Sequence, residues 1–297
     1  MSNNIEESQK LNISDELNLS DIISFFWKNK ITIISFGFVF SVISIIYSLS
    51  LENYYKSDAI LYVEDSSQTS GAISSLGNLA SLAGISINSS GEKKDLLAIN
   101  TMNSRVLLKK ILEFDEVLPS LVASKSFDKN SKKLIINKNF DPENPPIFSE
   151  IYKSYKEAFI VSQDKKTGLI YVSVEHLSPY FAKEFLDLII KQTNQALQER
   201  DLKRSTDAIN YLKGEYSKVN VIEIRERISN LIEAHLETQM TSRISNDYIL
   251  KTVDPPHLPD KKSKPSRASI CVAGALMGVF LGMIYSLLMF FRNSHEI

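Results

Sequence analysis

The chain has 297 residues, with 34 basic and 35 acidic side chains, so its formal net charge is −1. This balance lacks the basic excess typical of nucleic-acid-binding proteins, and we expect no nucleic acid among its partners. The single cysteine, Cys271, excludes intramolecular disulfides and multi-cysteine zinc or iron–sulfur sites. The apolar residues are concentrated in two blocks, and these blocks decide the class of protein.

Both apolar blocks predict membrane-spanning helices. Residues 31–51 and 268–291 contain no charged side chain. At about 1.5 Å per residue, each block is as long as the roughly 30 Å hydrocarbon core of a bilayer. We interpret the first block as an uncleaved membrane anchor. The polar segment before it contains acidic residues, and its apolar core is too long for a signal peptide. The expected layout is an N-terminal segment, 1–30, two spans and a short tail, 292–297.

Small residues mark one face of the second block. Gly274, Gly278 and Gly282 recur every four residues, which places them on one side of a helix. Such a stripe allows another helix to approach closely, so we expect these glycines to mediate transmembrane packing. The partner is either the first span or a neighbouring subunit. Charge leaves the orientation open, because basic residues precede the first span and also the second.

The segment between the spans, residues 52–267, is long enough to form a core of its own. Alternating apolar residues predict a strand over 57–64, and helical spacing predicts one helix over 93–114. The Ser- and Gly-rich stretch 66–91 is expected to form a short helix or a flexible arm. Prolines break the pattern over 115–149.

Two β-rich runs, 159–163 and 169–175, are separated by a loop that contains Gly168 and predict a hairpin. A last strand is expected over 247–253. The linker 254–267 follows it, and Pro255, Pro259 and Pro265 predict an extended, stiff approach to the second span.

A helical hairpin is predicted over about 178–244. Ser178 followed by Pro179 is typical of a helix start, and this first helix would reach roughly 55 Å if it is continuous. The second helix is expected to begin at Asn220 with a capping box closed by Glu223. Its apolar stripe includes Ile228 and Leu231. We take these four residues as candidates for subunit contacts within an oligomer.

No catalytic motif accompanies these elements. The sequence contains no Walker-type phosphate loop, no Gly-x-Gly-x-x-Gly and no Gly-x-Ser-x-Gly elbow. The four histidines lie far apart and none has His-Glu-x-x-His spacing. We therefore expect a protein that is not an enzyme, with no catalytic residue, no metal site and no cofactor.

The order of segments resembles the Wzz chain-length-determinant family, also called polysaccharide co-polymerases. The stretches that carry the resemblance are 19–28, the strand with Tyr62-Val63, Glu175-His-Leu-Ser-Pro179, Gln198-Glu-Arg-Asp201, 228–240, 246–255 and 259–267. The resemblance covers nearly the whole chain and lies in order and layout, because none of these motifs is catalytic.

The resemblance implies an α+β membrane protein of the inner membrane, with both termini cytoplasmic and a periplasmic α/β domain between two transmembrane helices. It also implies a homo-oligomeric ring that sets how far a polymerase extends an O-antigen-like lipopolysaccharide glycan. Membrane lipid and the growing glycan are the further contacts that it suggests. Two alternatives stay open: a polysaccharide export component, and an adaptor that activates a separate cytoplasmic tyrosine kinase, which would need a longer tail than 292–297.

Overall fold

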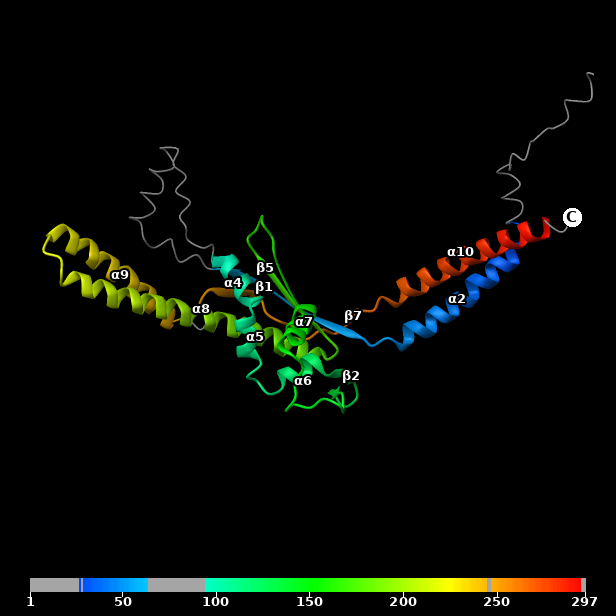
Figure 1. Cartoon of the computed structure of the whole chain (residues 1–297), viewed down its shortest axis with the longest axis horizontal. Coiled ribbons are helices and arrows are strands. Elements are labelled where there is room, and N and C mark those ends of the chain that lie inside the picture. The colour runs from blue at the N-terminus through cyan, green and yellow to red at the C-terminus, as the bar shows by residue number, and fades with distance from the viewer. Residues whose placement is uncertain (1–26, 28, 64–93, 245–246, 295–297) are drawn as a thin grey trace, which may run out of the picture. The chain divides into compact units, whose positions relative to one another are not determined.

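The computed structural model describes residues 27, 29–63, 94–244 and 247–294, and it divides into two units (Figure 1). One unit consists of Met1–Leu51 with Pro265–Ile297, and the other is Glu52–Lys264. The helix or arm expected over residues 66–91 lies outside the described residues.

The first unit is a pair of antiparallel helices, α2 (Lys30–Ser50) and α10 (Arg267–Ser294) (Figure 1). By length and composition, Lys30–Ser50 and Arg267–Met289 are each apolar enough to cross a membrane. Large apolar side chains point away from the partner helix, as Phe38 and Leu276 do with exposures of 69% and 66%. A helix that is apolar on its outer face as well as its inner one is suited to a lipid environment.

The second unit is built on a five-stranded antiparallel sheet in the order β4-β5-β1-β6, with β7 also paired to β1. The central strand β1 (Tyr54–Val63) alternates buried and exposed residues, as the sequence predicts, although it begins three residues earlier than expected. The strands around it are β4 (Phe159–Gln163), β5 (Ile170–His176), β6 (Leu250–Asp254) and β7 (Lys262–Lys264). The predicted β4–β5 hairpin is confirmed, with Gly168 in its turn at φ +74°.

Helices cover one face of this sheet. They are α4 (Lys94–Met102), α7 (Phe148–Ala158) and the first half of α8 (Pro179–Tyr216), and α5 (Arg105–Ile111) packs against α7 and α8. A short helix, α6 (Val117–Val122), leads into a separate two-stranded hairpin, β2 (Ser124–Asp128) and β3 (Lys133–Ile136).

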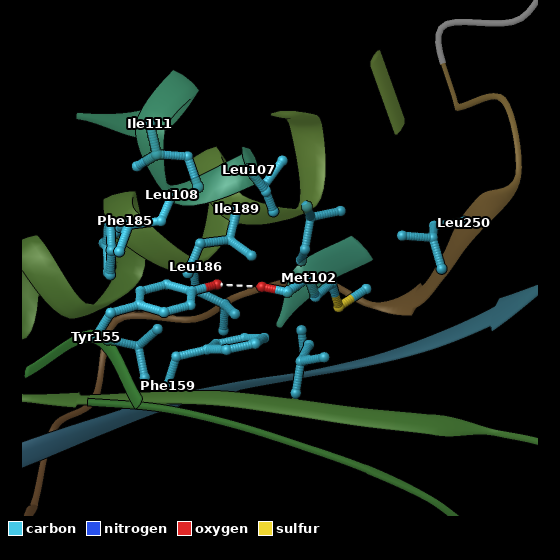
Figure 2. Close-up of a cluster of buried hydrophobic side chains, with 14 of the residues drawn as sticks. Met102, Leu107, Leu108, Ile111, Tyr155, Phe159, Phe185, Leu186, Ile189 and Leu250 are labelled. Carbon is cyan, nitrogen blue, oxygen red and sulfur yellow. Dashed lines mark hydrogen bonds between the residues drawn. The ribbon is translucent and has the colours of Figure 1, made fainter. Parts of the chain in front are cut away.

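Aromatic rings fill the centre of the core between the helices and the sheet (Figure 2). Tyr155 of α7 stacks on Phe159 at 5.4 Å between ring centroids and meets Phe185 of α8 edge-on at 6.1 Å. Its hydroxyl donates to the Met102 carbonyl at 2.6 Å, which ties α7 to the end of α4. Burial raises the pKa of the Tyr155 phenol, so this hydroxyl stays protonated and keeps its donor role.

The single helix predicted over 93–114 is wrong, because the structure has two helices there. Thr101 and Asn103 bond back to carbonyls of α4, and Ser104 then caps α5 by accepting from the Leu107 amide at 3.0 Å. A serine in this position competes with continued helix and favours a new start. The break turns the apolar faces of both helices toward the core.

The helix predicted from Ser178-Pro179 is continuous. Ser178 accepts a hydrogen bond from the Phe181 amide at 3.3 Å, and α8 then runs for 38 residues, about 57 Å at about 1.5 Å per residue. The second helix, α9 (Ile222–Ile244), begins two residues later than expected. Its first helical bond runs from the Arg225 amide to the Val221 carbonyl, so Val221 stands where Asn220 was expected as the cap.

Asn194 joins α8 to the sheet through three hydrogen bonds. Its side chain is buried, its oxygen accepts from the amides of Ile249 and Leu250 at 3.2 and 2.9 Å, and its nitrogen donates to the Leu250 carbonyl at 3.0 Å. The amide therefore behaves like a short strand partner for the beginning of β6. Because backbone groups buried without partners are costly, this one side chain fixes where the chain re-enters the sheet after the helical hairpin.

We expect Asn194→Leu to lower the free energy of unfolding by about 3 kcal/mol or more, because three buried backbone groups lose their partners. Chemical unfolding of the full chain in detergent would measure this loss. Asn210→Leu is the matched control, since Asn210 is an exposed residue of the same helix and should change the stability little. Equal stability of the two variants would contradict the role given to Asn194.

Candidate functional site

The helical hairpin of α8 and α9 extends beyond the sheet, and the four residues singled out from the sequence occupy different positions on it. Ile228 packs against α8 with 8% exposure, whereas Leu231 is 52% exposed. Asn220 lies exposed in the connecting loop, and Glu223 is exposed in the first turn of α9. Only Ile228 therefore stabilises the hairpin itself.

The polar middle of α8 finds polar partners within the chain. Thr206 accepts from the Gln239 amide of α9 at 2.8 Å, and Gln198 donates to the Ser242 carbonyl. Two small buried residues, Ser205 and Ser242, allow the helices to approach closely. The polar stretch is thus stabilised by contacts with α9.

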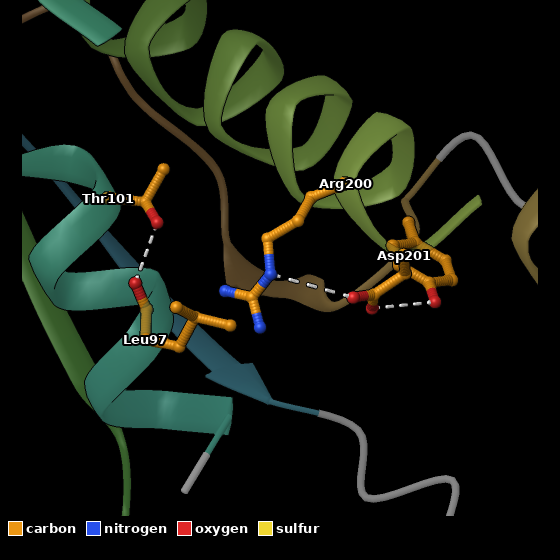
Figure 3. A network of polar contacts seen from close by, with 5 residues as sticks. Leu97, Thr101, Arg200 and Asp201 are labelled. Atoms are coloured by element: carbon orange, nitrogen blue, oxygen red, sulfur yellow. Dashed lines mark hydrogen bonds and ion pairs between the residues drawn. The ribbon is translucent and has the colours of Figure 1, made fainter. Parts of the chain in front are cut away.

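Charged residues hold the base of the hairpin (Figure 3). Asp201 accepts from the Tyr248 hydroxyl at 3.0 Å and lies 3.9 Å from the Arg200 guanidinium. Glu199 meets Lys110 of α5 at 2.6 Å. These groups are partly exposed, so we assign them to orienting the helix and expect only a small stability contribution.

Large apolar side chains stay exposed on more than one side of α9. We call four of them the α9 stripe: Ile224 and Leu231, seven residues apart, and Leu236 and Met240, four residues apart, with exposures of 45%, 52%, 44% and 65%. A helix within a monomeric soluble domain normally turns such residues inward. Near the tip, a hollow of about 440 Å³ lies between the two helices, beside Tyr216, Ile232 and Leu236.

The glycine stripe of α10 faces α2. A Cβ atom on Gly278 would lie 2.7 Å from the Phe36 carbonyl oxygen, and one on Gly274 would lie 2.4 Å from the Ser44 side chain. A Cβ on Gly282 would lie 3.0 Å from the Ile33 Cα.

The helix pair also shares polar and aromatic contacts. The Ser44 hydroxyl donates to the Ile270 carbonyl at 2.7 Å, and Phe36 stacks on Tyr285 at 5.2 Å between ring centroids. A side-chain hydrogen bond to a helix carbonyl and a close backbone approach are both typical of membrane helix pairs. The sequence left two packing partners open for the glycines of α10. In the structure they face α2, the other helix of the same chain.

The proline-rich linker is bound to the sheet along part of its length. Pro259 is buried, Pro255 is exposed and Pro265 is half-buried. The fully buried Ser57 of β1 donates to the His257 carbonyl at 2.8 Å, and Lys264 of β7 meets Glu175 at 2.5 Å. The sequence predicts an extended approach, and the structure adds that the linker pairs with β1 as the strand β7 before α10 begins.

A buried histidine lies beside a pocket of about 290 Å³ at the end of β5. His176 Nδ1 accepts from the Ser178 amide at 3.1 Å, so its proton is on Nε2. Nε2 lies 2.9 Å from the Ser120 carbonyl and 3.1 Å from the Ser124 hydroxyl. A nitrogen that already carries a proton cannot take one from serine, so this pair does not form a nucleophile and base.

Burial lowers the pKa of His176 from 6.5 to about 4, against the opposing effect of hydrogen bonds at Ser120 and Ser178. The ring is therefore neutral at pH 7. Its hydrogen bonds join α6, the start of β2 and the beginning of α8, which is a structural task.

Residues 15–113 match a family model described as Wzz, chain length determinant protein. The matched stretch includes α2, β1, α4 and α5. The chain carries a Wzz region. This match confirms the family resemblance seen in the sequence.

Two solved structures also match the chain. A full-length bacterial polysaccharide co-polymerase is 14% identical, with a TM-score of 0.42, and the alignment covers 94% of this chain and 98% of that one. A fragment of WzzB, a polysaccharide co-polymerase from Salmonella Typhimurium, is 18% identical, with a TM-score of 0.29 and coverages of 71% and 100%. A comparison with curated proteins gives no match.

Three residues that organise this chain were not singled out from the sequence. Asn194 and His176 act through contacts with segments about 55 residues away, and Ser57 bonds to the linker 200 residues away. The sequence does contain a signal for Asn194, because its amide side chain lies within an otherwise apolar helix stripe. A polar residue on a buried face usually has a specific partner.

Gly278→Leu should lower the thermal stability of the full chain in detergent and reduce its oligomeric mass. The new side chain would collide with α2 backbone atoms, and overpacking of this kind costs about 1–3 kcal/mol. Circular dichroism and light scattering would measure the two effects. Ala273→Leu is the control, since Ala273 is exposed on the same helix. Unchanged mass and stability of the Gly278 variant would refute the packing role.

Acidification should destabilise the chain partly through His176. The unfolded imidazole takes up a proton near pH 6.5 and the folded one only near pH 4, so stability is lost as pH falls between these values. The slope reaches about 1.4 kcal/mol per pH unit at most. Unfolding measured across this range should show a shallower slope for His176→Gln than for His235→Gln on α9. Parallel profiles would count against this assignment.

Proposed function

We propose that the protein regulates the chain length of a bacterial surface polysaccharide and is a non-enzymatic scaffold for the polymerase that extends it. The observation that carries this proposal is the match of residues 15–113 to the Wzz chain length determinant model. Wzz proteins act in polysaccharide chain-length control, and this supports the same role here. The proposal includes an O-antigen-like glycan as the regulated polysaccharide and the polymerase as a direct partner.

The two apolar helices support a membrane location. An antiparallel pair that spans a bilayer places both chain ends on one side and the intervening domain on the other. We therefore assign residues 1–30 and 292–297 to the cytoplasm and 52–267 to the periplasm, with α2 and α10 in the inner membrane. The contacts of the glycines with α2 support treating the pair as one packed anchor.

The α9 stripe supports a homo-oligomeric scaffold. Within the described parts of the second unit, these apolar side chains are left 44% to 65% exposed, and such a group on a soluble helix is typical of an interaction surface. A second copy that presents its own hairpin would supply an apolar partner along the same length. In this arrangement the tips of the hairpins remain available to the glycan and the polymerase.

Deletion of the gene, followed by a length-resolving gel of the surface polysaccharide, tests the proposed function. A modal band of lengths should collapse to short chains and return when the gene is restored. Accumulation of glycan of normal length inside the cell would instead favour an export component. An unchanged pattern, in a strain without a second copy of such a gene, would contradict the regulator role.

Leu231→Glu should fail to restore the modal band, because a charge in the centre of the α9 stripe opposes burial against a second copy. Its oligomeric mass in detergent should fall while its helical content stays the same, since Leu231 does not pack in the domain core. Asn230→Glu adds the same charge at an exposed neighbouring position and should restore the band. If both variants restore it, the α9 stripe is not the subunit contact.

A further inference from the structure

The β2–β3 hairpin is a concentrated source of positive charge in a nearly neutral chain. Residues 124–138 contain five lysines and one aspartate, a net charge of 5 − 1 = +4. The lysines, all exposed, are Lys125, Lys129, Lys132, Lys133 and Lys138. Among residues 27, 29–63, 94–244 and 247–294, none of these five lysines forms an ion pair.

The single carboxylate of the hairpin is used inside its own turn. Asp128 accepts from the Asn130 amide at 2.9 Å and from the Ser131 hydroxyl at 2.7 Å. These bonds, led by that from Ser131, lower the pKa of Asp128. The carboxylate therefore fixes the shape of the turn that displays the lysines.

Aromatic contacts hold the hairpin against one particular end of the sheet. Phe127 lies 6.4 Å from Tyr55 of β1 and 6.2 Å from Tyr180 of α8, measured between ring centroids. The Lys129 and Lys132 ammonium groups lie over the rings of Tyr55 and Tyr180 at 5.8 and 5.9 Å. The cationic turn is thus fixed beside the first residues of β1.

That end of the sheet is the one tied to both apolar helices. Residues 51–53 separate Ser50 of α2 from Tyr54 of β1, and residues 265–266 separate Lys264 of β7 from Arg267 of α10. At about 3.5 Å per residue, neither connection can exceed about 15 Å. If α2 and α10 span the bilayer, as the proposed function holds, this end of the sheet is confined to the membrane surface.

We infer that the β2–β3 hairpin docks on the anionic phospholipid headgroups of the bilayer that anchors the chain. Clustered lysines near such a surface are attracted to it, and the exposed Ile135 and Ile136 of β3 add apolar contact at the interface. The docked hairpin would hold the base of the domain at a fixed height above the membrane.

The opposite turn of the same sheet provides a built-in comparison. The β4–β5 turn carries Lys165 and Lys166, but it lies at the other end of β5. Leu61 pairs with Ile170 near this turn, whereas Tyr55 pairs with His176 at the tied end. Six residues of strand separate the two ends, about 20 Å at about 3.3 Å per residue, so lysines at the β4–β5 turn are not confined to the surface.

The experiment uses the full chain with Cys271→Ala, reconstituted in phosphatidylcholine vesicles with or without phosphatidylglycerol. A fluorophore is attached at Asn130→Cys in the hairpin, at Lys165→Cys in the opposite turn, or at Glu52→Cys just after α2, and a headgroup-bound quencher reports proximity to the membrane. We expect quenching at Asn130 to be roughly twofold stronger with phosphatidylglycerol and to fall at high salt, where screening is strong. Quenching at Lys165 should stay low in both lipids.

A triple variant, Lys125→Gln, Lys133→Gln and Lys138→Gln, should abolish the phosphatidylglycerol effect at Asn130 and leaves both lysine–tyrosine contacts in place. Strong quenching at Glu52 without any at Asn130 would overturn the docking inference alone. No quenching at Glu52 would instead refute the membrane anchoring that the proposed function assumes. Quenching at Asn130 that is equal in both lipids would also overturn docking on anionic headgroups.

Discussion

One helix, α8, must satisfy two environments along its length, and the rest of the domain is arranged around that constraint. Its first half buries Phe185, Leu186 and Ile189 in the core beside the sheet, whereas beyond Asp201 its main neighbour among the described residues is α9. The change of environment occurs near Asn194, where the amide side chain replaces a strand partner for β6. Because the helix does not break there, the rigid core and the projecting hairpin share one continuous backbone. The buried contacts of the base therefore determine where the hairpin points.

Elements with strong local signals could be predicted from the sequence. The two apolar helices, the alternation of β1, the β4–β5 turn at Gly168 and the start of α8 after Ser178 all depend on residues close to one another in the chain. The division into α4 and α5 was missed because Ser104 interrupts a pattern that is helical on both sides. The β2–β3 hairpin and β7 were missed for another reason: their strands are short and rich in lysine, and they are held by distant residues such as Tyr55 and Tyr180. Local propensity is weak in such segments, so long-range packing decides.

The same distinction applies to the candidate site. The glycine repeat of α10 is visible as a spacing, and the structure adds that its facing atoms belong to α2. On α9, periodicity alone places Ile228 and Leu231 on one stripe, yet only the first is covered by α8. A stripe wider than one neighbouring helix can cover leaves part of itself exposed, and that exposed part is the surface on which the proposed subunit contact depends.

The unbroken run of α8 also limits how this fold can change in length. Each residue added to the projecting half turns everything beyond it by about 100° around the helix axis and raises it by about 1.5 Å. A single added residue would rotate the exposed surface of the outer part of α9 away from the direction in which it now faces. An addition of three or four residues to both helices restores that direction. The height of the hairpin and the direction in which its exposed surface faces are therefore coupled. A hairpin of this kind can become taller or shorter only in whole helical turns if that surface is to keep its alignment.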